Sequence, residues 1–452
     1  RDVAPSRGLG DVYKRQGLHL WYYAKYDPSV PTSEMASLLS SCKDIEIIEY
    51  SLAAETSDHR RAASPAAGAQ SVTRAIADEV RNVPFPFNES ERSQQMQWHY
   101  NNTGNIFAQT SQLGADANVY AAWQLSTGNP DVIVAVVDQG VKYDHEDLAA
   151  NMWVNEAELN GTPGVDDDGN GYVDDIYGYN FTKETGELDF SAELMHGTHV
   201  AGTIAAVNNN GVGVCGIAGG SGRGDGVKIM SCQIFHDKDG GDAATSAKAI
   251  KYAADNGAAI IQCSYGYPAG SVTSDAAYSS GASAEKQAID YFIAKQNCAA
   301  VSGGLAIFAA GNDLTGISGY PGAYRDYISV TAMSCDYTPA YYTNYGPGCN
   351  IAAPGGDAYQ SYLENIKTGA SEVLSTVNGG KYGYMQGTSM ACPHVSGVAA
   401  LGLSYALQLG KTFTQNEFTT LLLTSVNDIN QYCTGTKQYF TDKGSLATLD
   451  LS

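Results

Sequence analysis

Basic residues, and charged residues in general, are scarce in this chain of 452 residues. Charged side chains make up 16% of the sequence, whereas about 25% is usual for a globular protein. The chain has 26 Lys and Arg against 48 Asp and Glu, so its formal net charge is −22. Proteins that bind nucleic acid or an anionic membrane surface need a basic face. The charge balance therefore argues against both kinds of partner.

Paired cysteines, long apolar runs and a secretory signal are also absent. The nine cysteines form no CxxC pair, which argues against a zinc site and a disulfide framework. Cys215, Cys232 and Cys263 lie in apolar contexts and are expected to be small buried side chains. A pairing of Cys335 with Cys349 stays open. We find no run of the roughly 20 apolar residues that a transmembrane helix needs, and no apolar signal core at the start of the chain.

Glycine and hydrophobic residues are plentiful, at 50 residues and 43% of the chain, so a sizeable core is expected. The predicted strands lie at residues 131–141, 227–235, 258–266, 305–312 and 327–334. The predicted helices lie at residues 196–207, 245–257, 285–298 and 387–407. Continuous apolar strands that alternate with helices are typical of a parallel sheet covered on both faces. The pattern predicts an α/β fold.

Several predicted strands end on a polar residue next to glycine. Asp138 ends VIVAVVDQG, Ser264 ends AIIQCSYG and Asn312 ends LAIFAAGN. Two predicted helices begin with a reactive side chain, His196 in HGTHVAGTIAAV and Ser389 in GTSMACPHVSG. Because sites in open parallel sheets form beyond the carboxyl ends of the strands, this is where a site is expected.

These residue types supply what acyl transfer on an amide requires. Ser389 can attack as nucleophile, His196 can take its proton, and Asp138 can hold the other imidazole nitrogen. Asn312 offers a side-chain N–H₂ to the oxyanion, beside the Ser389 backbone N–H at the helix start. The sequence therefore predicts a catalytic set of Asp138, His196, Ser389 and Asn312.

The fragments VVDQG, HGTHVAGT, AAGN and GTSMACPHVSG, in this order, resemble the subtilisin-like serine proteases, or subtilases. The resemblance extends from about Gln97 to about Asp442, and the order Asp, His, Ser is that of subtilisin itself. One departure is Gln139, where the family often has Ser or Thr; this position does not transfer a proton in the reaction, so we discount it. The resemblance implies a three-layer α/β/α fold with a mainly parallel central sheet, and serine endopeptidase activity.

The resemblance also implies how a substrate binds. The residues concerned are Ser264, Tyr265, Gly266, Ala310, Gly311 and Gly319. The first three would form an edge strand that pairs with the substrate backbone. The next two would form one wall of the pocket for the side chain before the scissile bond, and the last glycine its floor. The family carries a cis peptide where this chain has Tyr320–Pro321, so one is predicted there.

An acidic loop, GVDDDGNGYVDDI, is a candidate calcium site. The predicted ligands are Asp166, Asp168, Asn170, the Tyr172 carbonyl and Asp175, with Asp174 as an alternative to the last. The spacing is like the start of an EF-hand loop, with glycine in sixth position but without the Glu of position twelve. Oxygen ligands favour calcium over zinc, and similar loops bind calcium in related proteases. A solvated acidic turn is the alternative.

The resemblance implies a second calcium site. Its ligands would be Asp147, Val207, Asn209, Val212 and Val214, the valines through their carbonyls, with Asn210 as an alternative to Asn209. The loop is one residue longer than usual, which leaves its register open, and a plain structural turn is the alternative.

The remaining histidines of these motifs are expected to have no catalytic role. His145, His199 and His394 are expected to be structural, and His99 to lie at the surface or between domains. Cys392 is one helical turn past Ser389 and is expected in the core.

The chain divides into four predicted regions. They are a non-native leader at 1–16, a partial small α+β propeptide at 17–50, a linker and processing region at 51–95, and a catalytic domain at 96–452 whose C-terminal end looks truncated. A strand over 18–26, a helix over 33–42 and a strand over 45–52 are predicted in the propeptide, and a short helix near 72–80 in the linker. The resemblance implies that the propeptide inhibits the enzyme and that the protein is secreted or in the cell envelope.

The preferred function is a serine endopeptidase that cleaves proteins or peptides, with activity that rises as His196 loses its proton. A peptide ligase or macrocyclase on the same fold would capture the acyl-enzyme with an amine instead of water. A non-catalytic binding protein on a protease scaffold would be expected to lack a member of the triad, and none is missing. A calcium-dependent structural module would not need GTSM at a helix start.

Overall fold

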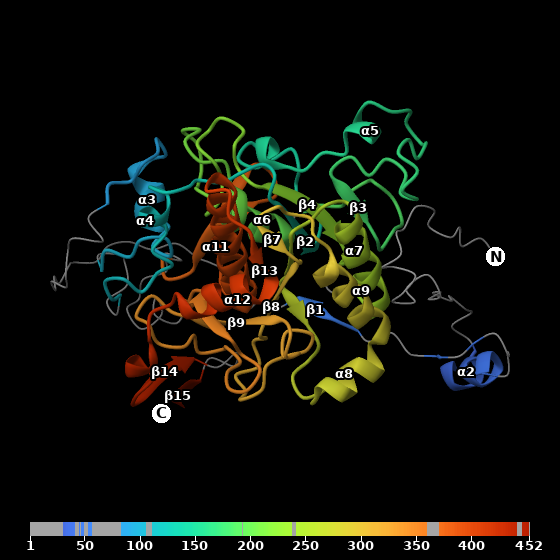
Figure 1. Ribbon diagram of the computed structural model, residues 1–452. Coiled ribbons are helices and arrows are strands. Elements are labelled where there is room, and N and C mark those ends of the chain that lie inside the picture. The colour runs from blue at the N-terminus through green and yellow to red at the C-terminus, as the bar shows by residue number, and fades with distance from the viewer. Residues whose placement is uncertain are drawn as a thin grey trace.

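The computed structural model describes residues 30–40, 45, 47–48, 53–56, 83–104, 111–191, 193–236, 241–358, 370–440 and 445–451 (Figure 1). Its centre is a seven-stranded sheet in the order β10-β9-β8-β5-β2-β4-β3. In chain order these strands are β2 (Ile133–Asp138), β3 (Gly178–Asn180), β4 (Lys228–Gln233), β5 (Ile260–Cys263), β8 (Leu305–Ala309), β9 (Ile328–Met333) and β10 (Ile351–Pro354). Every neighbouring pair is parallel. The predicted α/β fold is confirmed.

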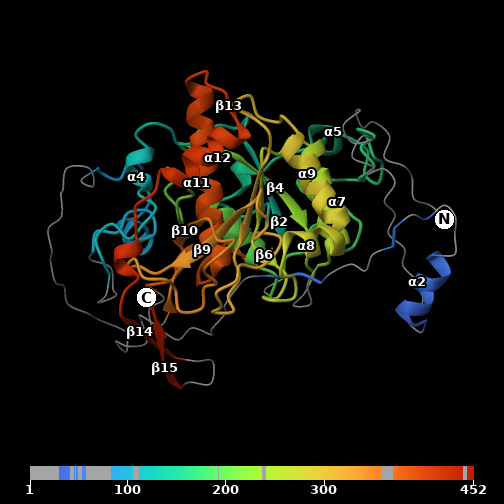
Figure 2. The same cartoon turned by 60° about the horizontal axis from the view of Figure 1, so that its bottom comes forward.

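Helices cover both faces of this sheet (Figures 1 and 2). The helices are α6 (His196–Ala205) and α11 (Thr388–Gln408) on one face, and α7 (Ala243–Asp255) and α9 (Ser283–Ala294) on the other. Strand β2 is buried on both sides, since Val134 and Val136 join one hydrophobic cluster while Ala135 and Val137 join the other. This double burial is why the strands read as continuous apolar runs.

Smaller elements lie around this framework. The short helices are α3 (Glu91–Met96), α4 (Val119–Ala122), η2 (Ala149–Asn151), α5 (Glu156–Leu159), α8 (Asp275–Gly281), α12 (Gln415–Thr424) and η3 (Asn430–Tyr432). The strands outside the main sheet are β7 (Val301–Ser302) with β13 (Phe413–Thr414), and the hairpins β11 (Val373–Val377) with β12 (Lys381–Met385) and β14 (Thr436–Phe440) with β15 (Leu446–Asp450). None of these was predicted from the sequence.

The N-terminal region is described only in part. Helix α2 (Thr32–Ser40) agrees with the predicted helix and lies at the margin of the molecule in both views (Figures 1 and 2). Ile45, Ile47 and Ile48 are in neither helix nor strand, so the strand predicted over 45–52 is not found at these three residues. The strand predicted over 18–26 and the helix near 72–80 lie outside the described residues.

Two segments of the predicted linker are ordered against the main body. Strand β1 (Glu55–Thr56) pairs antiparallel with β6 (Tyr265–Gly266). From residue 83 onward the chain packs on the core, with the ring of Phe85 5.3 Å from that of Tyr120 and the ring of Phe87 4.8 Å from that of Trp123. The packed body therefore begins before residue 96.

The cysteines in the described parts of the chain are all free. Cys215, Cys232, Cys263 and Cys392 are buried in the core, as predicted. The possible disulfide between Cys335 and Cys349 is not found, because both cysteines are free. Cys335 packs against Trp98 in a small cluster.

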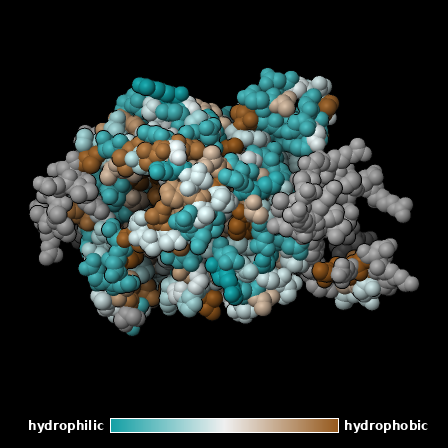
Figure 3. Space-filling view, viewed as in Figure 1, coloured by the Kyte–Doolittle hydropathy of each residue, from teal (hydrophilic) through white to brown (hydrophobic). Residues whose placement is uncertain are grey.

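Helix α11 overturns the expectation that no apolar run reaches the length of a transmembrane helix, because its 21 residues are long and apolar enough to cross a membrane. Most of them are buried inside the protein, as in the core helix of a globular fold, so these features do not establish a membrane span. Figure 3 shows that hydrophilic residues cover most of the face seen in Figure 1, with hydrophobic residues in smaller groups.

Candidate active site

Asp138 and His196 meet where strand β2 ends and helix α6 begins. The Nδ1 atom of His196 lies 2.7 Å from Oδ1 of Asp138, and both side chains are fully buried. The Gln139 N–H donates to the same carboxylate at 2.6 Å. Gln139 also accepts, through Oε1, a hydrogen bond from the backbone N–H of His196 at 3.0 Å. The carboxylate therefore fixes the orientation of the imidazole, and Gln139 caps the helix that carries it.

Ser389 lies in the first turn of α11, where a backbone N–H has no carbonyl four residues earlier within the helix. The turn that leads into this helix needs glycine, because Gly387 has a φ of 151°. The Ser389 hydroxyl donates to the carbonyl of Ser264 at 3.0 Å. The nucleophile candidate is thus tied to the end of the neighbouring strand β5.

A proline explains a second contact between the same two residues. Pro393 has no N–H, so it leaves the carbonyl of Ser389, four residues earlier, without its helical donor. The hydroxyl of Ser264 donates to this carbonyl at 2.8 Å. The Ser264 hydroxyl thus takes the place of the missing helical donor. This hydrogen bond links the predicted substrate strand to Ser389.

Asn312 is oriented as an oxyanion donor requires. Its Oδ1 accepts from the backbone N–H and the hydroxyl of Thr388 at 2.9 and 3.0 Å. This directs the amide nitrogen away from Thr388, and Nδ2 is buried with no hydrogen-bond partner among the described residues. A buried, unpaired donor is costly, and a developing oxyanion would satisfy it.

Asn344, which the sequence reading missed, holds the loop that carries Asn312. Its backbone N–H donates to the Gly311 carbonyl at 3.0 Å, and its Nδ2 donates to Ala310 O and Asp313 Oδ2 at 3.0 Å each. Its Oδ1 accepts from the Asp313 N–H at 2.9 Å. No chemical motif marks Asn344 in the sequence; only the fold brings it to this loop.

The predicted substrate strand is occupied by the chain's own β1. Thr56 is opposite Tyr265 and Glu55 is opposite Gly266 in an antiparallel register. On the neighbouring stretch Ala54, 1% exposed, donates its N–H to the Gly241 carbonyl at 2.8 Å. The strand edge that was assigned to substrate therefore does pair with an extended peptide segment.

The predicted pocket residues lie next to this edge. Gly319 donates its N–H to the Ala310 carbonyl at 2.8 Å, and a Cβ on Gly319 would lie 3.2 Å from the carbonyl oxygen of Tyr267. Gly311 has a φ of 102° and donates to the Thr388 hydroxyl at 3.2 Å. The Tyr320–Pro321 peptide bond is cis, as predicted.

Four further histidines, His99, His145, His199 and His394, are buried and make their hydrogen bonds outside this constellation. His199 contacts the carbonyls of Val373 and Gly383, and burial lowers its pKa to about 3. His394 contacts the Met390 carbonyl at 2.7 Å and His99 at 2.8 Å, and burial lowers its pKa to about 4. His145 contacts the carbonyl of Lys381. His99 is fully buried, so its predicted surface position is wrong; the bond to α11 holds it in the core.

The acidic loop gathers three carboxyl groups whose oxygens lie within 4.8 Å of one another: Glu158, Asp168 and Asp175. Glu158 was not predicted, since it precedes the loop and belongs to α5. Asn155 donates its amide to both aspartates, at 3.0 and 2.9 Å, and Asn170 donates to both at 3.0 and 3.1 Å. Burial raises the pKa of Asp175 to about 6.

Two of the predicted ligands have other contacts. Asp166 accepts from the backbone N–H groups of Asn170 and Gly171, so its carboxylate braces the loop. The ring of Tyr172 packs 4.9 Å from that of Tyr252, a contact that does not involve the carbonyl predicted as a ligand. The oxygen-only cluster fits a hard cation such as calcium, and a half turn of each asparagine amide would present its oxygen to the ion.

A second acidic group forms around Asp147. Its carboxylate accepts from the Asn210 amide at 2.7 Å and from the Val214 N–H at 2.9 Å, and burial raises its pKa to about 7. The loop brings Asn210 to this point, whereas Asn209 donates its amide to the Ser221 carbonyl. The other two valines are nearby: the Val207 N–H donates to the Asp147 carbonyl and the Val212 N–H to Asn210 Oδ1.

Glu89 is a further member of this group that the sequence reading missed. It is 3% exposed, and one of its oxygens accepts from the Asn210 N–H at 3.1 Å. Its other oxygen, Oε2, is buried without a hydrogen-bond partner among the described residues. An orphaned buried carboxylate oxygen beside a second carboxylate fits a bound cation.

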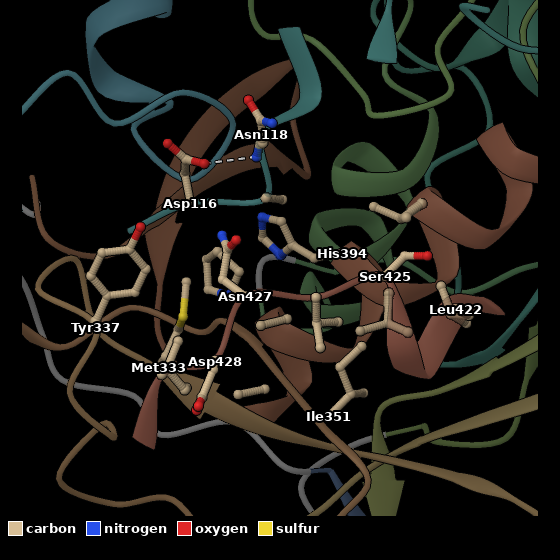
Figure 4. A pocket seen from close by; sticks show the side chains of 18 of the residues that line it. Asp116, Asn118, Met333, Tyr337, Ile351, His394, Leu422, Ser425, Asn427 and Asp428 are labelled. Atoms are coloured by element: carbon tan, nitrogen blue, oxygen red, sulfur yellow. Dashed lines mark hydrogen bonds between the residues drawn. The ribbon is translucent and has the colours of Figure 1, made fainter. Parts of the chain in front are cut away.

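A cavity of about 680 Å³ lies elsewhere in the molecule. Figure 4 shows His394 and Asn118 at one side of it and Ile351 and Leu422 at another. None of the residues predicted for catalysis, substrate or metal lines it. The chemistry described above is therefore not located in this cavity.

Comparison with known proteins identifies relatives over most of the chain. The profile of the subtilase family matches residues 129–447. Over 288 residues the chain is 36% identical to the halolysin-like extracellular serine protease Nep of Natrialba magadii, a match that covers 64% of this chain and 42% of that protein. It is 31% identical over 280 residues to subtilisin-like protease 1 of Plasmodium berghei (strain Anka), covering 60% and 42%. The chain thus matches about two fifths of the length of these relatives.

Solved structures give the same fold. A protease from Pseudoalteromonas arctica PAMC 21717 aligns with a TM-score of 0.50 and 29% identity, covering 76% of this chain and 93% of that one. A lanthipeptide protease aligns with a TM-score of 0.53 and 22% identity, covering 74% and 87%. The latter likeness concerns the fold alone.

Proposed function

This chain belongs to the subtilase family, and on that premise we propose that it is a serine endopeptidase that acts through an acyl-enzyme on Ser389. The observation that carries the proposal is the constellation at the carboxyl end of the sheet. A buried Asp138–His196 pair, a serine at a helix start and an unpaired buried amide nitrogen on Asn312 lie on adjacent elements. Together they supply base, nucleophile and oxyanion donor.

The proposed reaction follows from these groups. Rotation of the Ser389 hydroxyl from the Ser264 carbonyl toward His196 lets Nε2 take the proton while Oγ attacks the peptide carbonyl carbon. Asn312 Nδ2 and the Ser389 N–H hold the oxyanion. His196 then gives the proton to the leaving amine as the C–N bond breaks. Water, deprotonated by His196, hydrolyses the ester, and the proton returns to Ser389. Asp138 supports the charged imidazolium throughout.

We propose that Ser264, Tyr265 and Gly266 bind the substrate backbone, with Ala310, Gly311 and Gly319 around the side chain before the scissile bond. The pairing of β1 with β6 supports this role, because it is the β-augmentation expected of a substrate. The same pairing supports inhibition by the chain's own N-terminal region, because a segment in β1 excludes other peptides from the edge.

Calcium is proposed as a structural cofactor at the two acidic groups. Glu158, Asp168 and Asp175, with the amides of Asn155 and Asn170, would hold one ion. Asp147, Asn210 and Glu89 would hold another. Bound calcium would neutralise buried carboxylates and fix the loops; it takes no part in the reaction. One relative is named halolysin and another a halolysin-like extracellular serine protease, which supports secretion.

The direct test is hydrolysis of an unfolded protein and of internal peptide bonds in a defined peptide. We expect cleavage with calcium present and its loss in Ser389→Ala. Products extended by an added amine would instead identify the ligase alternative, in which the acyl-enzyme avoids water. Binding of the peptide without any cleavage would identify the non-catalytic alternative.

A further inference from the structure

Glu285 is a buried carboxyl group behind the substrate edge. It lies in the first turn of α9 and is fully buried. None of the ion pairs between described residues involves it. A buried carboxyl without a cation is costly unless hydroxyl or amide donors satisfy it, so its surroundings need an explanation.

Four hydroxyl groups from separate elements converge on this carboxyl. Oε1 accepts from Ser246 of α7 at 2.5 Å and lies 3.5 Å from the hydroxyl of Tyr265 of β6. Oε2 accepts from Tyr267, just after β6, at 2.5 Å and from Tyr278 of α8 at 3.0 Å. Burial raises the pKa of Glu285 to about 7, and the four hydroxyls oppose that rise.

Two of these tyrosines also form the substrate edge and the pocket. Tyr265 pairs with Thr56 of β1 in the same strand that is proposed to bind substrate. The backbone N–H of Tyr267 donates to the Tyr320 carbonyl at 2.7 Å. The carbonyl of Tyr267 faces Gly319 at the proposed pocket floor. The Glu285 carboxyl therefore supports both the strand edge and the pocket floor, from the side opposite to the substrate.

We propose that Glu285 is a positioning residue for substrate binding, which fixes the strand Tyr265–Tyr267 through the hydroxyls of its two tyrosines. The inference rests on the proposed protease function. Glu285 touches neither substrate nor Ser389. Its effect is on extended peptides that pair with the strand, and a ligand that contacts only Ser389 is indifferent to it.

The test compares Glu285→Gln and Tyr267→Phe with a matched control, Tyr327→Phe. Tyr327 lies in the same hydrophobic cluster, and its buried hydroxyl has no hydrogen-bond partner among the described residues. Each variant is assayed on a peptide amide with four residues before the scissile bond, on a nitrophenyl acetate ester that has no amino-acid side chain to enter the pocket, and by the rate at which a fluorophosphonate labels Ser389. Circular dichroism melting identifies the folded variants.

We expect KM for the long peptide to rise about five- to ten-fold in Glu285→Gln and Tyr267→Phe, as loss of one or two hydrogen bonds predicts. The ester kcat/KM and the labelling rate should stay within about two-fold in all variants. An unchanged KM in the folded variants, or an equal loss on peptide and ester, would overturn the role of Glu285. If Glu285→Gln does not fold, Tyr267→Phe decides alone. Absence of labelling in the wild-type protein would instead refute the protease function itself.

Discussion

At the residue scale, the site depends on side chains that carry no chemistry of their own. Asp138, His196, Asn312 and Ser389 could be chosen from the sequence because each has a reactive group in a recognisable fragment. Gln139 was set aside there because it does not transfer a proton in the reaction. In the structure it caps the helix of His196, a contact that joins positions 57 apart and that no local pattern reveals.

Gln139→Ala should lower kcat more than it alters KM. The N–H of His196 would lose its acceptor, a helix-capping loss of about 1 kcal/mol, and the imidazole would be less well held. We expect kcat to fall about ten-fold, since small displacements of a catalytic group are costly. Gln139→Glu keeps an acceptor oxygen and should retain more activity than Gln139→Ala. Equal kcat values for the alanine variant and the wild type would show that the cap is dispensable.

Buried histidines predict a loss of stability in acid. The pKa of His394 is lowered to about 4 by burial, whereas in the unfolded chain it would be about 6.5. Between these values the unfolded state binds more protons, so His394 lowers stability as pH falls below about 6.5, by about 1.4 kcal/mol per pH unit. Above that range its effect is absent. Glu285, with its raised pKa, acts in the opposite direction, because the folded state binds its proton more tightly and stability therefore rises as pH falls.

The measurement is urea unfolding of the wild type and His394→Gln at several pH values from 5 to 7. The variant should be less stable at pH 7, and the difference should shrink by about 1.4 kcal/mol per unit below pH 6.5. Parallel profiles would mean that His394 does not titrate with unfolding. The comparison within one pair of proteins removes the contribution of Glu285.

At the element scale, long apolar strands and helices were predictable and short polar ones were not. β2, β4, β5, β8 and β9 are buried on both faces, which leaves an apolar run in the sequence. The hairpins β11–β12 and β14–β15 are stabilised by contacts with distant parts of the chain instead. Glu158 and Glu89 were missed for the same reason, since each joins its acidic group from a different segment.

The C-terminal hairpin is anchored by a buried ion pair. Lys437 of β14 lies 2.6 Å from Asp357, with side-chain exposures of 7% and 0%. Lys437→Met would leave the Asp357 carboxylate without its cation, which lowers the free energy of unfolding by about 3–5 kcal/mol. Protonation of Asp357 would reduce this loss. Urea unfolding of the variant should show this loss, and Lys437→Met combined with Asp357→Asn should recover part of it. A loss in the free energy of unfolding below about 0.5 kcal/mol would mean that the Lys437–Asp357 pair contributes no more than an exposed ion pair.

The acidic loop should confer calcium-dependent stability. Calcium at 100 times its Kd would add about 2.7 kcal/mol, which raises Tm by several degrees. Glu158→Gln should remove much of this shift. Glu156→Gln is the matched control, because Glu156 lies in the same helix but is exposed. Thermal melts with calcium and with a chelator measure the shift in Tm for each variant. An equal shift in Glu158→Gln and the wild type would exclude Glu158 as a ligand.

At the scale of the whole molecule, the position of β1 restricts where maturation can cut. Antiparallel pairing carries the chain from Thr56 toward the Ser264 end of the edge, where Ser389 lies. From residue 83 the chain is packed on the body. We therefore expect cleavage within residues 57–82, within the predicted processing region. Mass spectrometry of the mature N-terminus locates the cut, and Ser389→Ala should remain uncut; a new N-terminus before Thr56 or after Val83 would contradict the arrangement.

The central claim is that Ser389 is a nucleophile activated by His196. The most direct measurement is labelling by a fluorophosphonate, with the modified residue identified by mass spectrometry, in calcium and after removal of the N-terminal region. We predict one label, on Ser389, that is absent in Ser389→Ala and much slower in His196→Ala. No label on Ser389 in the folded, calcium-loaded protein would contradict the account.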